Sequence, residues 1–175
     1  DGSGAKNIIV KGGGKRFPTF ESTPELTDLE LLEKFNLSRL SLKGPEIFSF
    51  TIEHVPPMIR NVMGYAGIDD INQIDQFILH QANAFILNHL RKKIGIPAEE
   101  CPIAMREFGN TSSASIPLTI AATCGKEIVD RRIKVLLAGF GVGWSWGACI
   151  TDLQLDIVPR VLKLPEDFKP LSVDL

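Results

Sequence analysis

Three polar stretches of this sequence contain residue types that can transfer a proton or stabilise a negative oxygen. In the first, "HQAN", His80 follows an apolar run and precedes a run of helical spacing. An imidazole at the carboxyl end of a strand lies where α/β folds place ligand-binding groups, and it can donate or accept a proton. A role for His80 and Asn83 in capping the following helix explains the same residues equally well.

The other two stretches offer hydrogen-bond donors without charge. Asn110, in "FGNTSSAS", has an amide that can donate to a developing negative oxygen, although an N-cap role is the simpler interpretation. The glycines of "GFGVGWSWG", residues 139–147, let backbone N–H groups point into a cavity, as an oxyanion hole requires. The alternative is an ordinary hairpin packed by Trp144 and Trp146. The remaining histidines, His54 and His89, are expected in helices, facing solvent or partly packed surface.

Hydrophobic spacing predicts the elements that position these stretches. Short apolar runs indicate strands at residues 7–11, 74–79, 135–140 and 148–155, of which the last two form a hairpin. Helical spacing predicts helices at 24–35, 45–67 and 82–94, and a further helix from 109–115 to about 123 or 126. Pro56 and Pro57 predict a kink or break in the second helix. Helices that alternate with strands indicate an α/β layered domain.

Composition argues against several classes of function. Hydrophobic residues make up 44% of the 175 residues and charged residues 23%, as in a globular domain. A formal net charge of -2 without a basic stripe argues against nucleic acid, and the longest apolar run, 135–144, is too short to span a membrane. Cys101, Cys124 and Cys149 lack the spacing of a metal site or disulfide framework, which favours no metal and a reducing, cytoplasmic setting.

In their order along the chain, "ILHQAN", "FGNTSSASIP" and "GFGVGWSWGA" resemble the C-terminal half of β-ketoacyl-acyl-carrier-protein synthase III, of the thiolase superfamily. The likeness extends from "DGSGA" through "KGPEIFSF" to about Leu153. It implies a thiolase-like layered sandwich, here the C-terminal half plus the last strands of a missing N-terminal half, with a homodimer in the full enzyme. The expected parts are terminal strands (1–22), a connecting segment (23–44), the C-terminal domain (45–155) and a proline-containing tail (156–175).

The resemblance also implies a reaction. Members of the family transfer an acyl group from coenzyme A to a cysteine, and malonyl-acyl carrier protein then loses carbon dioxide and condenses with that acyl group. Carried over by motif, the catalytic residues are His80 and Asn110, and the backbone N–H of Val142 forms an oxyanion hole. No cofactor is implied beyond the coenzyme A or phosphopantetheine of the substrates. The carrier-docking segment would be Gln81, Ala82, Asn83, Ala84 and Phe85.

This sequence departs from the family pattern in ways that keep other functions open. Phe85 holds a place often taken by arginine, Pro45 one where asparagine is common, and Val142 one where glycine is common. The nucleophilic cysteine of the family precedes "DGSGA", and the three cysteines here are interpreted as packing residues, so this chain alone is expected to be inactive. It is also expected to self-associate, because the missing half would leave apolar surface exposed. The alternatives are a related acyltransferase with a different acceptor, or a non-catalytic half-fold that docks on a complete synthase. The beginning without methionine predicts a fragment, a processed product or a trimmed chain.

Overall fold

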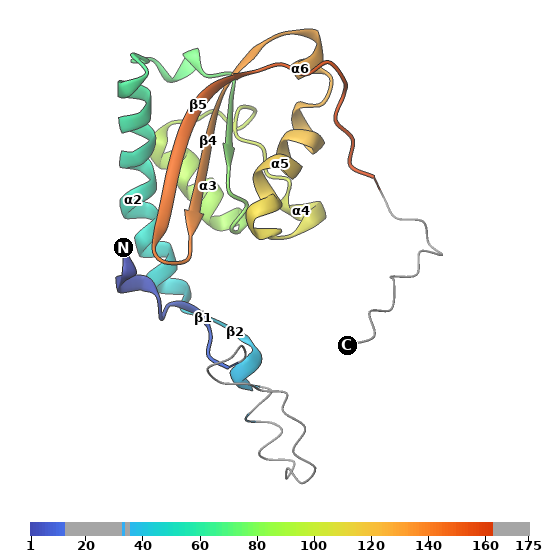
Figure 1. Ribbon diagram of the computed structural model, residues 1–175. Coiled ribbons are helices and arrows are strands. Elements are labelled where there is room, and N and C mark those ends of the chain that lie inside the picture. Colours follow the sequence, from blue (N-terminus) through green and yellow to red (C-terminus); the bar gives the residue numbers. More distant parts are fainter. Residues whose placement is uncertain (13–32, 34–35, 163–175) are drawn as a thin grey trace.

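A three-stranded sheet lies at the centre of the computed structural model, which describes residues 1–12, 33 and 36–162 (Figure 1). Its strands are β3 (Gln76–Leu79), β4 (Ile133–Gly141) and β5 (Ser145–Leu153), in the order β3-β4-β5. β3 is parallel to β4, whereas β4 and β5 form an antiparallel hairpin. Helices cover both faces of this sheet, so the predicted α/β class and the predicted hairpin are confirmed. None of the helices in the described part of the chain combines the length and hydrophobicity that a membrane span requires.

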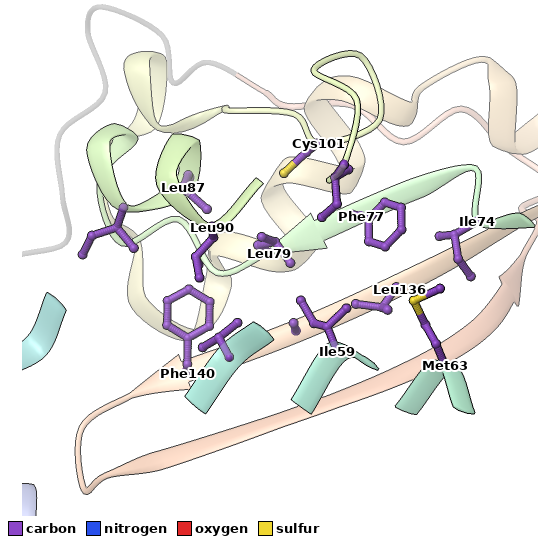
Figure 2. Close-up of a cluster of buried hydrophobic side chains, with 14 of the residues drawn as sticks. Ile59, Met63, Ile74, Phe77, Leu79, Leu87, Leu90, Cys101, Leu136 and Phe140 are labelled. Atoms are coloured by element: carbon purple, nitrogen blue, oxygen red, sulfur yellow. The ribbon is translucent and has the colours of Figure 1, made fainter. Parts of the chain in front are cut away.

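Two longer helices, α2 (Gly44–Tyr65) and α3 (Ala84–Ile94), pack on one face of the sheet. The close approach of their side chains to alternate residues of β3 and β4 forms the main core (Figure 2). Each large side chain that is fully buried there contributes about 1.5–3 kcal/mol relative to exposure. The figure labels ten members of this core: Ile59, Met63, Ile74, Phe77, Leu79, Leu87, Leu90, Cys101, Leu136 and Phe140.

Of the kink or break predicted at Pro56 and Pro57, the break does not occur, because α2 continues through both residues to Tyr65. Pro56 has no N–H, so it cannot donate to the carbonyl of Ile52 four residues earlier. The ammonium of Lys93 on α3 donates to that carbonyl instead, at 3.1 Å. A side chain from the neighbouring helix therefore replaces one of the hydrogen bonds that the prolines remove.

Short helical turns cover the other face of the sheet. They are η3 (Ser112–Ala114), α5 (Ser115–Thr119), the π-helical turn η4 (Ile120–Cys124) and α6 (Glu127–Asp130). They pack on a second cluster of buried side chains, formed by Ile78, Cys124, Ile128, Ile133 and Val135. One continuous helix was expected here, with a side-chain N-cap; the structure divides it into short segments, and neither η3 nor α5 has a side-chain hydrogen bond at its cap.

The first residues of the chain contact the tip of the β4–β5 hairpin. After the turn η1 (Gly2–Gly4), β1 (Ile8–Val10) pairs antiparallel with β2 (Leu40–Leu42) in a separate two-stranded sheet. Gly4 is buried so close to Trp144 that a Cβ atom there would lie 2.2 Å from the indole ring. The helix expected at 24–35 and the end of the tail, 163–175, lie outside the described residues, apart from Glu33.

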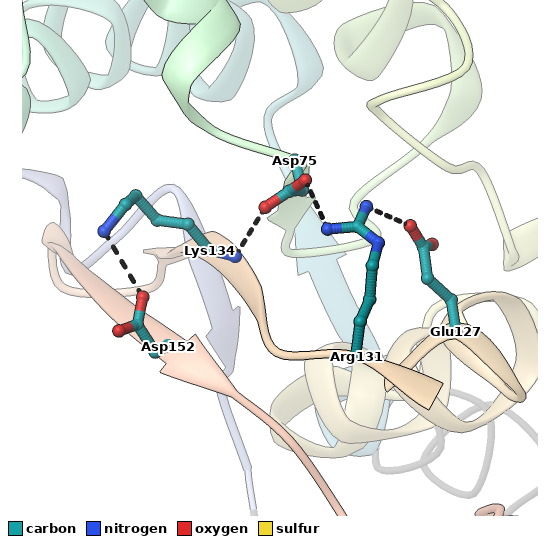
Figure 3. Close-up of polar contacts among 5 residues, drawn as sticks. All are labelled: Asp75, Glu127, Arg131, Lys134 and Asp152. Carbon is teal, nitrogen blue, oxygen red and sulfur yellow. Dashed lines mark hydrogen bonds and ion pairs between the residues drawn. The ribbon is translucent and has the colours of Figure 1, made fainter. Parts of the chain in front are cut away.

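A polar network connects the elements at the amino end of β3 (Figure 3). The carboxylate of Asp75 accepts the backbone N–H of Lys134 at 2.6 Å and Nη1 of Arg131 at 2.9 Å. Burial raises the pKa of Asp75, but the hydrogen bonds and the nearby positive charges outweigh it, so the pKa of this carboxyl lies below its usual range. The network holds the start of β4 against β3 at the edge opposite to His80. It also includes the pairs Arg131–Glu127 and Lys134–Asp152.

Candidate functional site

His80 is placed by the pairing of β3 with β4. It follows the last residue of β3, and its backbone N–H donates to the carbonyl of Ala138 at 2.8 Å, which extends the parallel ladder by one bond. The edge of its imidazole meets the ring of Phe140 on β4, with centroids 5.5 Å apart and an interplanar angle of 82°. The ring is therefore positioned by the strand that precedes it and by the neighbouring strand.

The other contact of the imidazole comes from the opposite layer of the domain. Nδ1 of His80 lies 2.7 Å from Oγ of Ser115, the first residue of α5, and Ser115 is only 2% exposed. Burial lowers the pKa of the His80 imidazole, and a hydrogen bond with the backbone of Ser112 acts in the opposite direction. Burial has the larger effect, so the neutral ring is favoured.

Asn110 lies in the loop between α4 (Met105–Phe108) and η3, next to the segment that follows His80. Its Oδ1 accepts the N–H of Ser112 at 2.9 Å, in an Asx turn rather than the expected helix cap. Its Nδ2 lies 3.4 Å from the carbonyl oxygen of Ala82. Gly109 before it has φ 68° and Ser112 after it has φ 53°, values in the left-handed region that few residues other than glycine adopt.

These contacts bring His80 and Asn110 to the same edge of the sheet. Asn110 bonds to Ala82, two residues after His80, while Ser115 from the Asn110 loop and helix bonds to His80 itself. The carboxyl end of β3, the loop before α5 and the tip of the β4–β5 hairpin lie at this edge in Figure 1. The two residues that sequence motifs single out thus lie at the same edge of the sheet, although thirty positions separate them in the chain.

Val142 lies in the turn of the hairpin, two residues beyond Phe140, and its side chain is 55% exposed. Among the described residues, no hydrogen bond joins Val142 to His80 or Asn110. The neighbouring Trp144 stacks on Phe50 of α2, with centroids 4.3 Å apart and rings 6° from parallel. Trp146 also packs on this helix, at 4.9 Å from the His54 ring, so the expected aromatic packing of the hairpin is observed.

Two members of the expected docking segment, residues 81–85, have structural tasks. The side chain of Gln81 is 2% exposed, so it faces the interior and does not point toward a partner. Its Nε2 donates to the carbonyl of Leu79 at 2.9 Å, and its Oε1 accepts the N–H of Ala104 at 2.9 Å. Asn83 is the N-cap of α3, with Oδ1 accepting the N–H of Ile86 at 2.8 Å. The capping interpretation is therefore confirmed for Asn83 but not for His80.

Phe85 is the exposed hydrophobic member of this segment. Its ring is 69% exposed and lies 5.5 Å from that of Phe48 on α2, while His89, one turn further along α3, lies 5.3 Å from Phe48. Phe48 belongs to α2, whereas Phe85 and His89 belong to α3. This small aromatic cluster therefore lies between the two helices, beside the start of α3. The sequence alone shows Phe85 as an apolar helix position, without indicating that it faces solvent.

The cysteines of the chain are not placed as nucleophiles. Cys101 and Cys124 are buried, as expected of packing residues, whereas Cys149 on β5 is exposed and the packing interpretation is wrong for it, because its side of this edge strand is uncovered. Burial raises the pKa of the Cys101 thiol to about 11 and also raises that of Cys124, so both are protonated at neutral pH. Within the described residues, no group of three or more metal-ligating side chains is close enough to hold a metal ion.

Sequence reasoning missed Ser115 and the inward direction of Gln81. Ser115 is one of three serines in "TSSAS", and their common residue type cannot show which of them faces the imidazole.

A cavity of about 340 Å³ lies away from His80 and Asn110, between the first residues of the chain, α2 and Trp144. Its lining consists largely of exposed side chains of α2 and the chain start, and it shares no residue with the site.

Comparison with known proteins identifies relatives of this chain. Residues 67–153 match the family described as 3-oxoacyl-[acyl-carrier-protein (ACP)] synthase III C terminal, and this range contains His80, Asn110 and Val142. β-Ketoacyl-[acyl-carrier-protein] synthase III of Lactococcus lactis is 37% identical over 121 residues, which are 68% of this chain and 37% of that protein. The enzyme of the same name from Clostridium acetobutylicum is 29% identical over 164 residues, 85% of this chain and 50% of that protein.

Solved structures agree with the sequence comparison. The 3-oxoacyl-(acyl-carrier protein) synthase of Burkholderia xenovorans superposes with a TM-score of 0.77 at 37% identity, over 92% of this chain and 44% of that one. The structure of the synthase III from Thermus thermophilus gives a TM-score of 0.68 at 29% identity, over 89% of this chain and 43% of that one. The chain thus spans between a third and a half of the length of these relatives.

Proposed function

This chain belongs to the 3-oxoacyl-[acyl-carrier-protein] synthase III family, and from this membership we propose that it supplies the enolate-stabilising half of a condensing active site. In the proposed reaction, a malonyl thioester carried by acyl carrier protein loses carbon dioxide. The electron pair of the broken C–C bond moves into the thioester, whose oxygen becomes negative. His80 and Asn110 each donate a hydrogen bond to that oxygen, and one such donor typically lowers the barrier by about 3 kcal/mol.

The observation that carries this proposal is the common location of the two side chains. Asn110 Oδ1 is already engaged by the N–H of Ser112, so its amide nitrogen is directed away from that contact, toward the segment after His80. An amide nitrogen has two protons, and the long 3.4 Å contact with Ala82 engages at most one of them. The second proton, together with a ring N–H of His80, makes a pair of uncharged donors, of which the His80 ring is half-buried and Asn110 is exposed.

The enolate then attacks an acyl group held on a cysteine. In this proposal the cysteine comes from the N-terminal half that relatives possess, and the acyl group arrives as a coenzyme A thioester. The backbone N–H of Val142 donates to the acyl thioester oxygen, while residues 82–85 receive the carrier protein, with Gln81 supporting them from inside. The acting enzyme is a cytoplasmic homodimer that needs no cofactor of its own.

The test is the decarboxylation of malonyl-acyl carrier protein by the polypeptide in which this chain occurs. We expect His80→Ala and Asn110→Ala each to reduce the rate by about 100-fold or more, because each removes a donor to the enolate oxygen. The matched controls are His89→Ala and Asn88→Ala on α3, which remove the same side-chain types from the surface or flank of the nearby helix. Unchanged rates in both site variants would refute the proposal.

A related acyltransferase with a different acceptor is the second candidate. The exposed aromatic ring of Phe85 favours it, since an apolar docking surface suits an acceptor other than a strongly acidic carrier. Analysis of the products formed from several acyl thioesters and acceptors distinguishes this candidate from the first: transfer without loss of carbon dioxide would select it.

A non-catalytic subunit is the third candidate, favoured by the burial of Cys101 and Cys124. A purely structural partner has no use for a paired His80 and Asn110, which weighs against it. Co-purification with a complete synthase, whose activity is unaffected by His80→Ala in this chain, would select this candidate.

A further inference from the structure

The hydroxyl of Ser115 makes an unusual contact for a helical serine or threonine. Such hydroxyls commonly donate to the carbonyl four residues earlier, and Thr51, Thr119 and Thr123 do so in this protein, each at 2.7 Å. Ser115 bonds instead to Nδ1 of His80, 35 positions away in the chain, at the same distance. It is also buried, so water does not compete for this hydroxyl.

The direction of this hydrogen bond follows from the other contact of the same oxygen. A hydroxyl has one proton and two lone pairs. The backbone N–H of Gln81 donates to Oγ of Ser115, at 3.4 Å, and so occupies a lone pair. Among the described residues this oxygen has no further hydrogen-bond partner, so the hydroxyl proton, which would otherwise be unsatisfied in a buried position, donates to Nδ1 of His80. A ring nitrogen that accepts a hydrogen bond has no proton of its own.

We infer that Ser115 is a positioning residue that holds the neutral His80 ring in the tautomer protonated at Nε2. In that tautomer the imidazole presents an N–H on the side away from Ser115, where an enolate oxygen would need a donor. The use of this donor in catalysis rests on the proposed function, whereas the tautomer itself does not. Burial, which favours the neutral form of the ring, is consistent with this arrangement.

The backbone N–H of Gln81, which donates to the Ser115 hydroxyl oxygen, belongs to a residue that is rigidly held. Gln81 is anchored on both ends of its amide, to the carbonyl of Leu79 and to the N–H of Ala104. The backbone N–H that points at Ser115 therefore has little freedom. Removal of the Ser115 hydroxyl would remove the hydrogen bond to Nδ1 of His80 and leave the ring its backbone contact with Ser112, so the two neutral tautomers would become closer in energy.

The test is long-range ¹H–¹⁵N correlation spectroscopy of the imidazoles in ¹⁵N-histidine-labelled protein, at a pH where His80 is neutral. His80→Gln identifies the His80 signals, and His54 and His89 serve as internal references. We expect the wild type to show the Nε2–H tautomer. In Ser115→Ala a distinct Nδ1–H population should appear, and Ser115→Thr, which keeps a hydroxyl, should restore the wild-type pattern. Thr119→Val is the matched control, because it removes a buried hydroxyl one turn later that does not touch His80.

A wild-type spectrum of the Nδ1–H tautomer would overturn the inference, as would an unchanged pattern in a folded Ser115→Ala variant. Should Ser115→Ala lose its dispersed amide spectrum, the wild-type tautomer and the Ser115→Thr pattern decide the question without it. These spectra need no substrate. If the polypeptide in which this chain occurs shows the Nε2–H tautomer but fails to decarboxylate malonyl thioesters, the proposed function is refuted and the role of Ser115 is left intact.

Discussion

His80 experiences two opposing influences from its surroundings. Burial between β4 and α5 disfavours the charged ring, and the backbone contact with Ser112 favours it; burial prevails and the pKa falls. A neutral imidazole beside a neutral amide forms a site without net charge. Such a site can stabilise a negative oxygen that exists only during the reaction, without first attracting anions from solution.

The lowered pKa of His80 predicts a pH dependence of stability. The folded ring releases its proton more readily than the unfolded ring, whose pKa is about 6.5. The folded state therefore binds fewer protons below that pH, and the free energy of unfolding falls as the pH is lowered from 6.5 through the folded pKa. Above 6.5 this contribution is fully present.

Denaturant unfolding at a series of pH values measures this effect. His80→Gln should flatten the dependence in that window, whereas His89→Gln, which changes an exposed ring on α3, should preserve it. A wild-type stability that rises as the pH drops below 6.5 would contradict the expected sign.

At the scale of elements, the β4–β5 hairpin is held at its tip by segments distant in sequence. Trp144 is stacked on Phe50 of α2, and its backbone carbonyl accepts the N–H of Asp1 at 2.9 Å. Gly4 of η1 lies directly against the indole. Because Val142 and the end of β4 belong to this hairpin, the contact positions one side of the candidate site.

Substitution of Gly4 tests this contact. We expect Gly4→Ala to lower the free energy of unfolding by about 1–3 kcal/mol, because the added methyl group would overlap the buried Trp144 ring. It should also shift the tryptophan fluorescence to longer wavelength as the indole becomes exposed. Gly2→Ala is the control, since nothing lies within 4 Å of the Cβ position at Gly2. Equal behaviour of the two variants would show that the close contact has no energetic importance.

At the scale of the whole molecule, most of the chain packs around the three-stranded sheet, whereas the β1–β2 ribbon forms a sheet of its own. A two-stranded ribbon is marginally stable by itself. This one exposes three neighbouring apolar side chains: Leu40 and Leu42 are each 58% exposed, and Val10, paired with Leu40, is 48% exposed. Apolar patches of this kind promote association.

We therefore expect the chain to self-associate, with an apparent mass in sedimentation velocity that rises with concentration. The double substitution Leu40→Glu and Leu42→Glu should reduce this association. Tyr65→Glu serves as the control, because Tyr65 is 90% exposed at the far end of α2. A monomer at every concentration in the wild type would contradict the prediction.

Sequence by itself determined the features that depend on local pattern. Apolar runs located β1, β3, β4 and β5 but not β2, and helical spacing located α3, which Gly95 ends with φ 93° as expected of its residue type. The same patterns placed His80 at the end of a strand and Asn110 before a helical segment, as the structure has them. These element positions could be predicted because hydrophobic periodicity and turn-forming residue types depend on consecutive residues.

The tertiary structure alone decided which polar groups meet. The continuity of α2 through Pro56 depends on Lys93 of another helix, and the division of the helix after Asn110 also departs from its local pattern. The pairing of Ser115 with His80 requires β3 and α5 to pack together. Residues far apart in the chain come into contact only when the elements that carry them bury their apolar surfaces against each other. The partners in such contacts therefore cannot be predicted from a local sequence pattern.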